Sequence, residues 1–539
     1  MGDWNNLKRW DAAAVQAVAD DLNAELKKLQ GTAAELRDAA TPKQWDGEGA
    51  QAAADSLKGI EQGVHNRVAE HAALRTAADD AASRLKHLQT AVEDVEEQAK
   101  ANRFVIEDGK VIAHPMATAE PGRGHPDTYT EVKEALQLQV DEIVRATVDI
   151  DVDLTNVMLS IADGNIIDQG AATMAQAVKT GNALGQSTAI EPPKNATAVQ
   201  NEAWWDTLSR AERDHLIKTK PELIGNRKGI PYSARSEANL NRIPAERERL
   251  EAEADQMREW VRKNGHAPLE LQEQLAEVQS KLDALDALLG QADAGRSILS
   301  LDTAGPGVRA AVAIGNVDAA EHVGVYVPGL YSKVEGNMGG YVDELEETTG
   351  YAEDMLKGTG EDVASVVWMD YHAPQDWGEV LSDDQAEAGA KRLAAELDGI
   401  QASRADNPPD RLTAIGHSYG STTAGLALKQ TDSADAFVSQ GSPGWGEGGL
   451  GDMKVPQREL YDMASYWDVV AGSGAHGDDP DWYDINHLSV EEARHPETGE
   501  LMVESSGHTD YTDADDKKST AEHNTAAVIV GRGDLLIKD

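Results

Sequence analysis

Short apolar runs rich in β-branched residues recur after residue 296, and this pattern constrains the fold more than any other feature of the chain. In chain order, the runs read RSILSLD, AAVAIGN, HVGVYVPG, DVASVVWMDY, RLTAIGH and DAFVSQGS. Helical stretches lie between them, and residues 382–403 are a clear example. Short strands that alternate with helices form a mostly parallel sheet covered on both faces. We therefore expect residues 296–539 to form an α/β domain.

The motif Gly416-His417-Ser418-Tyr419-Gly420 lies between the run RLTAIGH and a helix of small residues, STTAGLALK. A G-x-S-x-G match is common in a chain with 48 glycines. A sharp turn between a strand and a helix, however, is the context that a nucleophilic serine requires, and the helix dipole favours a developing oxyanion there. We predict that Ser418 is a nucleophile; the alternative is a serine that only caps the helix.

The acid of a hydrolytic triad is expected after the nucleophile, at the end of a later strand. A strand is predicted over the segment RELYDMASYWDVV, and Asp468 lies at its exit. Asp462 lies inside the same strand and is expected to be structural. A group of aspartates at residues 478–484 is expected to be a solvated loop. Asp468 is therefore the candidate acid.

The base is expected in a loop near the C-terminus, after the acid. His508 follows Gly507 and precedes a final helix predicted over residues 517–531, which makes it the candidate base. His487 is the main alternative. His495 lies in the same loop insert as His487, and His523 lies inside the final helix.

An oxyanion hole needs two backbone N–H groups aimed at one point. The amide of Tyr419 is the first candidate because it follows the nucleophile. The amide of Leu330 is the second, since the segment VYVPGLYS ends an early strand; Gly329 is the alternative donor, and a plain turn is the alternative interpretation. Residues 472–500 are expected to be a lid over the pocket or a packed loop. This chemistry needs no metal or cofactor.

Residues 1–185 are expected to be mainly helical, because their apolar residues recur every three or four positions. The two stripes run through Val15, Val18, Leu22, Leu26, Leu29, Ala33 and Leu36 and through Leu57, Ile60, Val64, Val68, Leu85, Leu88, Val92 and Val95. We expect them to form an antiparallel helical hairpin, followed by a small β-hairpin at residues 104–112. Residues 186–295 are expected to be a helical linker and a second hairpin, broken at residues 265–268.

Several segments after residue 204 carry a family resemblance: WWDTLS, GIPYSARSEANLNR, VYVPG, GHSYGSTTAGLAL, GSPG and GHTDY. Residues 204–539 resemble the actinobacterial α/β-hydrolase family of uncharacterised function, whose members resemble serine esterases and lipases. The resemblance implies an α/β-hydrolase fold for residues 296–539 and a triad of Ser418, Asp468 and His508. It does not supply a natural substrate.

The tripeptide Trp45-Asp46-Gly47, placed between the two helical stripes, resembles the turn of the WXG family. The helical hairpins of that family are handled by type VII secretion systems. The resemblance implies export to the cell envelope or beyond without a signal peptide, with a secretion chaperone as partner. Matches to that family's Y-x-x-x-[D/E] signal begin far downstream, at Tyr331 and Tyr511, and a cytoplasmic location is the alternative.

Composition narrows the classes of partner and site. The net charge of −46 disfavours nucleic acids and anionic membranes as partners. No apolar run is long enough for a transmembrane helix, and the N-terminus lacks the basic and apolar regions of a signal peptide. The absence of cysteine excludes disulfides, thiolate zinc sites and cysteine nucleophiles.

These features predict a serine hydrolase of the esterase or lipase type, acting on a small ester or a lipid. One alternative is a helical interaction or secretion-substrate protein whose hydrolase fold is inactive. Another is a phospholipase-type antibacterial toxin. The N-terminal hairpin is expected to bind a second copy of the chain or a helical partner, because its apolar stripes exceed what two helices need.

Overall fold

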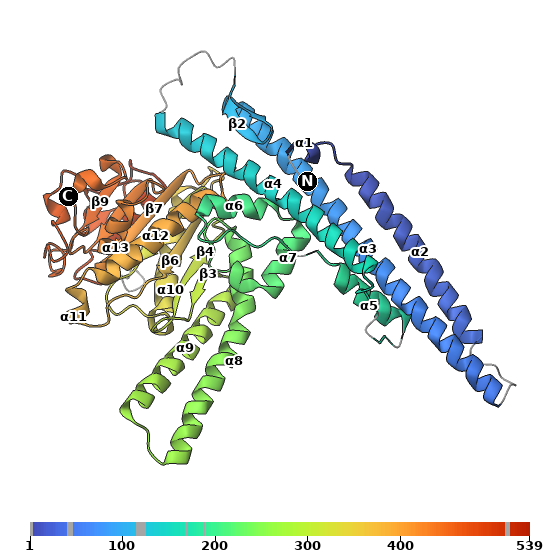
Figure 1. Ribbon diagram of the computed structural model, residues 1–539. Helices are drawn as coiled ribbons and strands as arrows, with labels where there is room; N and C mark the ends of the chain where they lie inside the picture. The colour runs from blue at the N-terminus through green and yellow to red at the C-terminus, as the bar shows by residue number, and fades with distance from the viewer. Residues whose placement is uncertain are drawn as a thin grey trace. The chain divides into compact units, whose positions relative to one another are not determined.

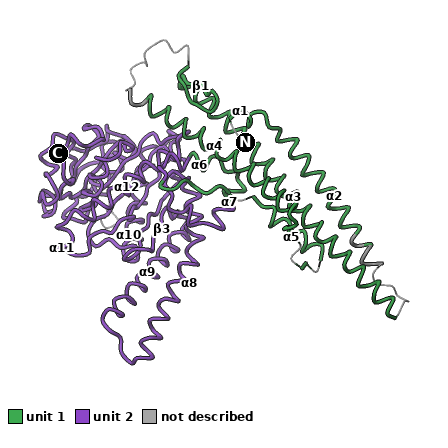
Figure 2. Tube along the Cα trace, viewed as in Figure 1, with its two compact units in different colours: residues 1–195, 203–214 green, residues 196–202, 215–539 purple. Residues whose placement is uncertain are grey.

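The protein divides into two compact units (Figure 2). Unit 1 comprises Met1–Asn195 and Ala203–Asp214, and unit 2 comprises Ala196–Glu202 and His215–Asp539. The computed structural model describes residues 4–39, 47–114, 126–167, 170–171, 173–187, 189–511 and 518–539. The expected boundaries at residues 185 and 295 differ from this division, because most of the stretch 186–295 is part of unit 2.

Unit 1 is a bundle of long helices (Figure 1). Helices α2 (Ala12–Ala39) and α3 (Glu48–Ala101) lie side by side in opposite directions, and α4 (Pro126–Ala162) and α5 (Met174–Gly185) pack on α3. The short α1 (Trp4–Leu7) contributes two buried side chains to their core. The predicted helical region is therefore confirmed, while Trp45 and Asp46 of the expected turn lie outside the described residues.

A small β-hairpin follows α3, as the sequence predicts. Strands β1 (Phe104–Glu107) and β2 (Lys110–Ala113) pair in antiparallel register, with Phe104 opposite Ala113. The connecting Asp108 and Gly109 both have positive φ angles, 50° and 75°. Two such residues form the tight turn whose twist matches that of the flanking strands.

A buried arginine joins three helices of unit 1. Arg84 of α3 is only 4% exposed. Its guanidinium nitrogens lie 2.6 Å from Asp149, 3.0 Å from Asp153 and 2.8 Å from Glu212. Asp149 and Asp153 belong to α4, and Glu212 belongs to α7 (Arg210–Thr219). Each guanidinium nitrogen therefore faces its own carboxylate, and this pairing offsets the cost of burying the charge.

Unit 2 is built on an eight-stranded sheet with the strand order β10-β9-β8-β7-β5-β6-β4-β3. The strands are β3 (Ser297–Asp302), β4 (Arg309–Ile314), β5 (His322–Val327), β6 (Val363–Met369), β7 (Arg411–His417), β8 (Ala436–Gln440), β9 (Leu460–Met463) and β10 (Asn486–His487). Neighbours from β10 to β6 pair in parallel, whereas β4 pairs antiparallel with β6 and with β3. The mostly parallel α/β sheet is confirmed; the two-residue β10 is an addition to it.

Helices cover both faces of this sheet, and alternate strand residues enter the two layers. Val367 packs with α10 (Val334–Met355) and α14 (Thr520–Ile529), whereas Val366 packs with α12 (Asp384–Ser403) and α13 (Tyr419–Leu428). Both valines are fully buried, which explains why the strands appear in the sequence as continuous apolar runs. Among the described residues, no helix is both long and apolar enough to span a bilayer.

A second helical hairpin is part of unit 2. Helices α8 (Tyr232–Asn264) and α9 (Leu269–Asp293) surround the predicted break, where Gly265 ends α8 with a φ of 73°. Asn239 of α8 donates a hydrogen bond to the Ile298 carbonyl of β3 over 3.0 Å. This bond and the burial of Ile243 and Leu285 in the core beside the sheet explain why the hairpin belongs to unit 2.

A buried ion pair accounts for the segment GIPYSARSEANLNR. Glu396 of α12 is 1% exposed, and it accepts hydrogen bonds from the Arg235 guanidinium over 2.7 Å and from the Tyr232 hydroxyl over 2.6 Å. Lys228 also bonds to this carboxylate. Burial alone would raise the pKa of Glu396, but Arg235 and Lys228 outweigh it and lower the pKa. These residues thus hold α8 against α12 and have a structural role.

The remaining elements of the chain are short. Helix α6 (Ala198–Thr207) and helix α7 each have residues in both units. Helix α11 (Trp377–Val380) precedes α12. Strands β11 (Ala493–Arg494) and β12 (Leu501–Met502) pair with each other outside the main sheet.

Candidate active site

Ser418 occupies a sharp turn at the carboxyl end of β7, directly before α13. Its φ and ψ are 56° and −132°, a strained conformation for a residue with a side chain. A Cβ atom at Gly420 would lie 2.0 Å from the Val327 carbonyl oxygen, and one at Gly416 would lie 2.5 Å from the Cα of Ser421. The two glycines of the motif are therefore required by close backbone packing around Ser418.

The structure brings the three predicted triad residues together. The Oγ of Ser418 lies 2.8 Å from Nε2 of His508. The Nδ1 of His508 lies 2.8 and 2.9 Å from the two carboxylate oxygens of Asp468. Because a carboxylate can only accept hydrogen bonds, Nδ1 carries the proton. Nε2 is therefore free to accept a hydrogen bond from the serine hydroxyl. Strand β9 ends at Met463, so Asp468 lies in the following loop and not directly at the strand exit as expected.

The Asp468 carboxylate is held by further donors. The amides of Val470 and Ala471 donate to Oδ1 over 2.9 and 3.0 Å, and the Tyr511 hydroxyl donates to Oδ2 over 2.8 Å. Burial alone would raise the pKa of Asp468, but the bonds from His508, Ala471 and Tyr511 outweigh it and lower the pKa. Asp468 is thus charged and fixed in orientation.

His417, the residue before the nucleophile, supports the candidate base. Its Nε2 donates to the backbone carbonyl of His508 over 2.6 Å, and the two rings are 5.0 Å apart. Burial lowers the pKa of His417 to about 4, so it is a neutral donor near pH 7. Sequence reasoning did not assign roles to His417 or Tyr511. Both lie inside motifs, one position before Ser418 and three positions after His508, and this proximity was the available signal.

Two backbone segments meet beside Ser418, where an oxyanion would form. A Cβ atom on Gly329 would lie 2.8 Å from the Cβ of Ser418 and 2.9 Å from the Tyr419 amide nitrogen. The amides of Tyr331 and Ser332 already donate to the Pro374 and Gly329 carbonyls. Within the described part of the chain, the amides of Tyr419, Gly329 and Leu330 donate no hydrogen bond.

The other candidate histidines are bonded elsewhere. Nε2 of His487 contacts the Tyr483 carbonyl, and its Nδ1 lies 3.6 Å from Asp481. The ring of His523 contacts the Tyr351 hydroxyl and packs edge-on against His495. None of these contacts involves Ser418.

Asp462 lies inside β9, and its carboxylate accepts a hydrogen bond from the Ser439 hydroxyl. Burial raises the pKa of Asp462 to about 8, and the nearby carboxylates of Asp481 and Asp479 add to the shift. A carboxyl group with this pKa is neutral at pH 7. It is therefore unsuited to stabilising an imidazolium, in contrast to Asp468.

The insert at residues 472–500 combines packed and exposed parts. Leu488 is buried, and its amide donates to the Asp462 carbonyl at the end of the β9–β10 pair. Tyr483 packs against Trp445, with their rings 5.5 Å apart. Trp482, by contrast, is 75% exposed. The part around β10 thus belongs to the sheet edge, which favours the packed-loop alternative for this part of the insert.

A cavity of about 650 Å³ lies in unit 2. Its lining includes Tyr371, whose hydroxyl donates to the Pro328 carbonyl, one residue before Gly329. Polar side chains also line it, among them Ser332 and Gln385, whose Oε1 is buried without a partner among the described residues. The cavity therefore borders the segment that carries the candidate oxyanion donors.

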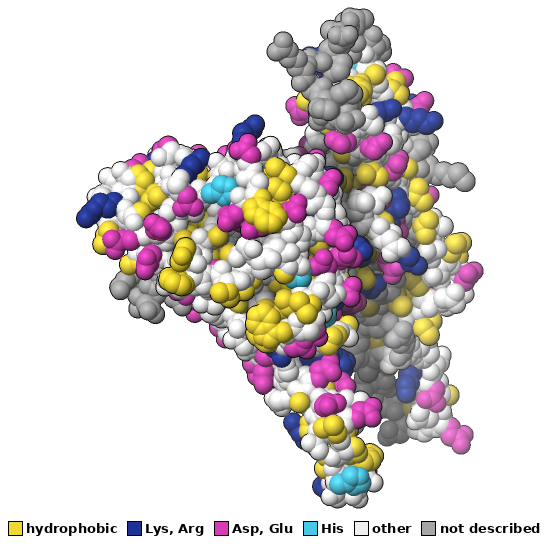
Figure 3. All heavy atoms as spheres, turned by 90° about the vertical axis from the view of Figure 1, so that its left-hand side faces the viewer, with side chains coloured by type: hydrophobic (Ala, Val, Ile, Leu, Met, Phe, Trp, Pro, Cys, Tyr) yellow, Lys and Arg dark blue, Asp and Glu magenta, His cyan; other side chains and the backbone are white. Residues whose placement is uncertain are grey.

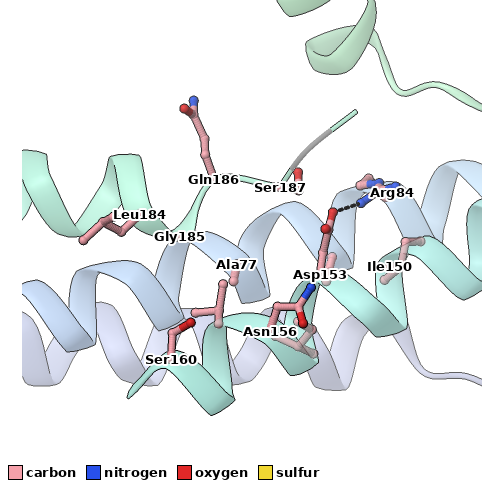
Figure 4. A pocket seen from close by; sticks show the side chains of 13 residues that line it. Ala77, Arg84, Ile150, Asp153, Asn156, Ser160, Leu184, Gly185, Gln186 and Ser187 are labelled. Atoms are coloured by element: carbon pink, nitrogen blue, oxygen red, sulfur yellow. Dashed lines mark hydrogen bonds and ion pairs between the residues drawn. The ribbon is translucent and has the colours of Figure 1, made fainter. Parts of the chain in front are cut away.

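Unit 1 contains a smaller cavity of about 210 Å³ (Figure 4). Arg84 and Asp153 line it and pair with each other, and Ser160 and Ser187 also face it. The described residues that line this cavity include no histidine. Neither serine therefore has an imidazole base within the cavity, unlike Ser418 in unit 2.

Comparison with known proteins matches residues 302–476 to an alpha/beta hydrolase family. An uncharacterised protein of Mycobacterium tuberculosis strain H37Rv is 30% identical over 266 residues, which are 46% of this chain and 38% of that protein. An uncharacterised protein of Mycobacterium bovis is 34% identical over 230 residues, covering 40% of this chain and 84% of that protein. The chain thus spans well under half of the first relative and most of the second.

Two solved structures are similar to parts of the chain. A dienelactone hydrolase from Anabaena variabilis has 16% identity and a TM-score of 0.22, over 32% of this chain and 74% of that protein. A putative dienelactone hydrolase from Klebsiella pneumoniae has 11% identity and a TM-score of 0.24, over 43% of this chain and 94% of that protein.

Proposed function

We propose that the chain, which belongs to the same family as the Mycobacterium bovis protein and matches an alpha/beta hydrolase family over residues 302–476, is a serine hydrolase that cleaves carboxylic esters through an acyl-enzyme. The observation that carries this proposal is the continuous hydrogen-bond chain from Ser418 through His508 to Asp468. A serine hydroxyl is a weak nucleophile by itself, and this chain supplies the base and the orienting acid that activate it.

In the proposed first step, Nε2 of His508 takes the proton of Ser418 as Oγ attacks the ester carbonyl. Asp468 holds the imidazole through Nδ1 and stabilises the imidazolium that forms. The protonated His508 then gives its proton to the leaving alcohol, and the acyl group remains on Ser418. In the second step, His508 takes a proton from water, which attacks the acyl group. The bond from Oγ to the acyl carbon then breaks, His508 returns the proton to Oγ of Ser418, and the acid is released.

The negative charge that develops on the carbonyl oxygen needs donors already in place. The Tyr419 amide lies at the N-terminus of α13, where helix dipoles favour an anion. The Leu330 amide is the proposed second donor, with Gly329 as the alternative. Both segments meet at Ser418, and their amides are unoccupied among the described residues. This arrangement supports stabilisation of the oxyanion by backbone groups.

For unit 1 we propose a role in recognition or export. All three proposed catalytic residues belong to unit 2, and the cavity of unit 1 lacks a histidine in its lining. A long helical hairpin fits a second copy of the chain, a helical partner or a secretion chaperone. Export without a signal peptide, to the cell envelope or beyond, is part of the same proposal.

Labelling with a fluorophosphonate tests the proposed nucleophile, because these reagents phosphonylate an activated serine. We expect one labelled residue, Ser418, identified by mass spectrometry of a proteolytic digest. Ser418→Ala should abolish labelling and reduce ester hydrolysis roughly 10⁶-fold, as loss of a catalytic serine does in comparable triads. Full labelling of the Ser418→Ala variant would contradict the proposal.

A further inference from the structure

Six large apolar side chains are exposed on three separate segments of unit 2. Each is between 50 and 88% exposed. They are Tyr331, Trp377, Leu381, Tyr466, Trp467 and Val469, and we refer to them as the apolar ring. Figure 3 shows hydrophobic side chains gathered in patches among acidic ones on one face of the globular part. Large apolar side chains exposed in this way indicate a surface that binds something apolar.

Two segments of the apolar ring adjoin the proposed catalytic residues directly. Trp467 and Val469 flank Asp468, whose carboxylate holds His508. Tyr331 follows Leu330 and Gly329, and Gly329 packs against Ser418. Anything that covers these side chains is therefore brought next to the nucleophile.

The third segment is bonded to the residue that follows the nucleophile. The Tyr419 hydroxyl donates to the Ser382 carbonyl over 2.6 Å, and it accepts from the Ala386 amide over 3.1 Å. Leu381 immediately precedes Ser382, and Trp377 lies one turn earlier on α11. All three exposed segments thus connect to Ser418 through a direct neighbour of the proposed triad or oxyanion site.

The charge of these segments restricts what can cover them. Residues 374–384 and 464–484, which carry five of the six side chains, contain nine aspartates and glutamates and no lysine or arginine: Asp376, Glu379, Asp383, Asp384, Asp468, Asp478, Asp479, Asp481 and Asp484. The segment of Tyr331 adds Lys333 and Glu335, whose charges offset each other. An anionic phospholipid surface would be repelled by this charge. An uncharged apolar surface would be accepted, because it buries the tryptophans without an electrostatic cost.

We propose that the apolar ring docks the protein onto the surface of an aggregated, uncharged long-chain ester, and that this surface supplies the substrate. The proposal rests on the proposed ester hydrolase function and names its substrate class. A protein that stayed bound to the ring would block the approach of substrate to Ser418. An ester surface, in contrast, delivers substrate at the same place that it docks. This difference favours the ester as the occupant.

Kinetics of the full-length protein test the proposal. The two substrates are p-nitrophenyl butyrate in solution and triolein dispersed as droplets without surfactant. We expect the ratio of triolein to butyrate hydrolysis to fall at least ten-fold in the Trp377→Ser/Leu381→Ser double variant. Leu269→Ser is the matched control, since Leu269 is 70% exposed at the tip of the α8–α9 hairpin in the same unit. Its ratio should stay within two-fold of the original.

A binding measurement separates this inference from the function on which it rests. The Ser418→Ala variant should co-float with triolein droplets but not with phosphatidylglycerol vesicles at low salt, and the added Trp377→Ser/Leu381→Ser change should abolish flotation. Suppose that the protein hydrolyses butyrate, the ratio of triolein to butyrate hydrolysis is unchanged in the double variant, and Ser418→Ala does not float. This result would overturn the docking inference alone, and a protein partner would then be the occupant of the apolar ring. Flotation without hydrolysis of either ester would support docking and overturn the hydrolase proposal instead.

Discussion

Each unit of the chain buries a cluster of charged side chains. The two clusters differ in whether hydrogen-bonding groups beside them remain without a partner among the described residues. In unit 1, all three nitrogens of the Arg84 guanidinium face carboxylates. In unit 2, Asp468 is equally well bonded, but its cluster ends at the Ser418 hydroxyl beside backbone amides that have no partner among the described residues. Closed polar clusters hold a fold together, whereas a preorganised donor set left unoccupied is what catalysis needs.

Asp468→Asn should cause a large loss of ester hydrolysis while the fold remains. An amide in place of the carboxylate changes which tautomer of His508 is favoured, and such losses reach roughly 10⁴-fold in kcat for related triads. Initial rates on a soluble ester, with circular dichroism as the folding control, measure the effect. Full activity of this variant would show that the Asp468 carboxylate, contrary to the proposal, does not serve catalysis.

His417→Gln should reduce kcat by about ten- to a hundred-fold, because small displacements of a catalytic base have effects of that size. The glutamine keeps a donor for the His508 carbonyl but not the shape of the ring. Ser418 should still react with fluorophosphonate, only more slowly. An unchanged rate would mean that the loop carrying His508 is positioned without this bond.

The same variant should also remove part of the acid sensitivity of the fold. The pKa of His417 is about 4 in the folded protein, whereas an unfolded histidine binds a proton below about pH 6.5. As the pH falls through this window, only the unfolded state gains the proton, so the free energy of unfolding decreases by about 3 kcal/mol. Urea unfolding at pH 7 and pH 4.5 should show a smaller decrease in His417→Gln.

Asp462→Asn should leave hydrolysis within about two-fold and change stability in the opposite pH direction. Burial raises the pKa of Asp462 to about 8, while an unfolded aspartate ionises near pH 3.9. Stability is therefore lost as the pH rises from about 4 to 8, by a few kcal/mol at roughly 1.4 kcal/mol per pH unit. The variant should have a flatter stability profile over this range in urea titrations. A large loss of activity would instead make Asp462 part of the site.

Arg84→Met should leave hydrolysis of a soluble ester unchanged within error while destabilising unit 1. Three carboxylates lose their cation, and breaking a buried ion cluster in this way costs about 3–5 kcal/mol. Arg67→Met is the control, because Arg67 of the same helix is exposed and pairs with Glu70 on the surface. Differential scanning calorimetry of the full chain measures both variants. Equal transition temperatures would contradict the interpretation that the fully paired Arg84 cluster stabilises unit 1.

The sheet and the serine turn are predictable because their signals are local. Continuous apolar runs indicate buried parallel strands, and the glycines around Ser418 mark a turn in which close packing excludes a side chain. His508 and Asp468 followed from the chain order of known triads. The site residues that the sequence did not reveal act over long separations, as in the 91 residues between His417 and His508.

The domain division was less predictable for the same reason. Helix α8 has the composition of a solvated helix, but its bonds to β3 and α12 and the burial of Ile243 and Leu250 in the core beside the sheet place it in unit 2. The end of β9 at Met463 is also not marked by a glycine or proline. Such boundaries depend on neighbours that the local pattern does not contain.

The pairing of Arg235 with Glu396 also has a consequence for synthesis of the chain. The two residues are 161 positions apart. At translation rates of about 5–20 residues per second, Glu396 leaves the ribosome roughly 8–30 s after Arg235. Burying the Arg235 guanidinium before its carboxylate has been synthesised would cost desolvation free energy without a compensating ion pair. Helix α8 therefore stays undocked during that interval. Every residue of unit 1 has by then been synthesised, and the nascent helical bundle is therefore free to fold well before the sheet of unit 2 is complete.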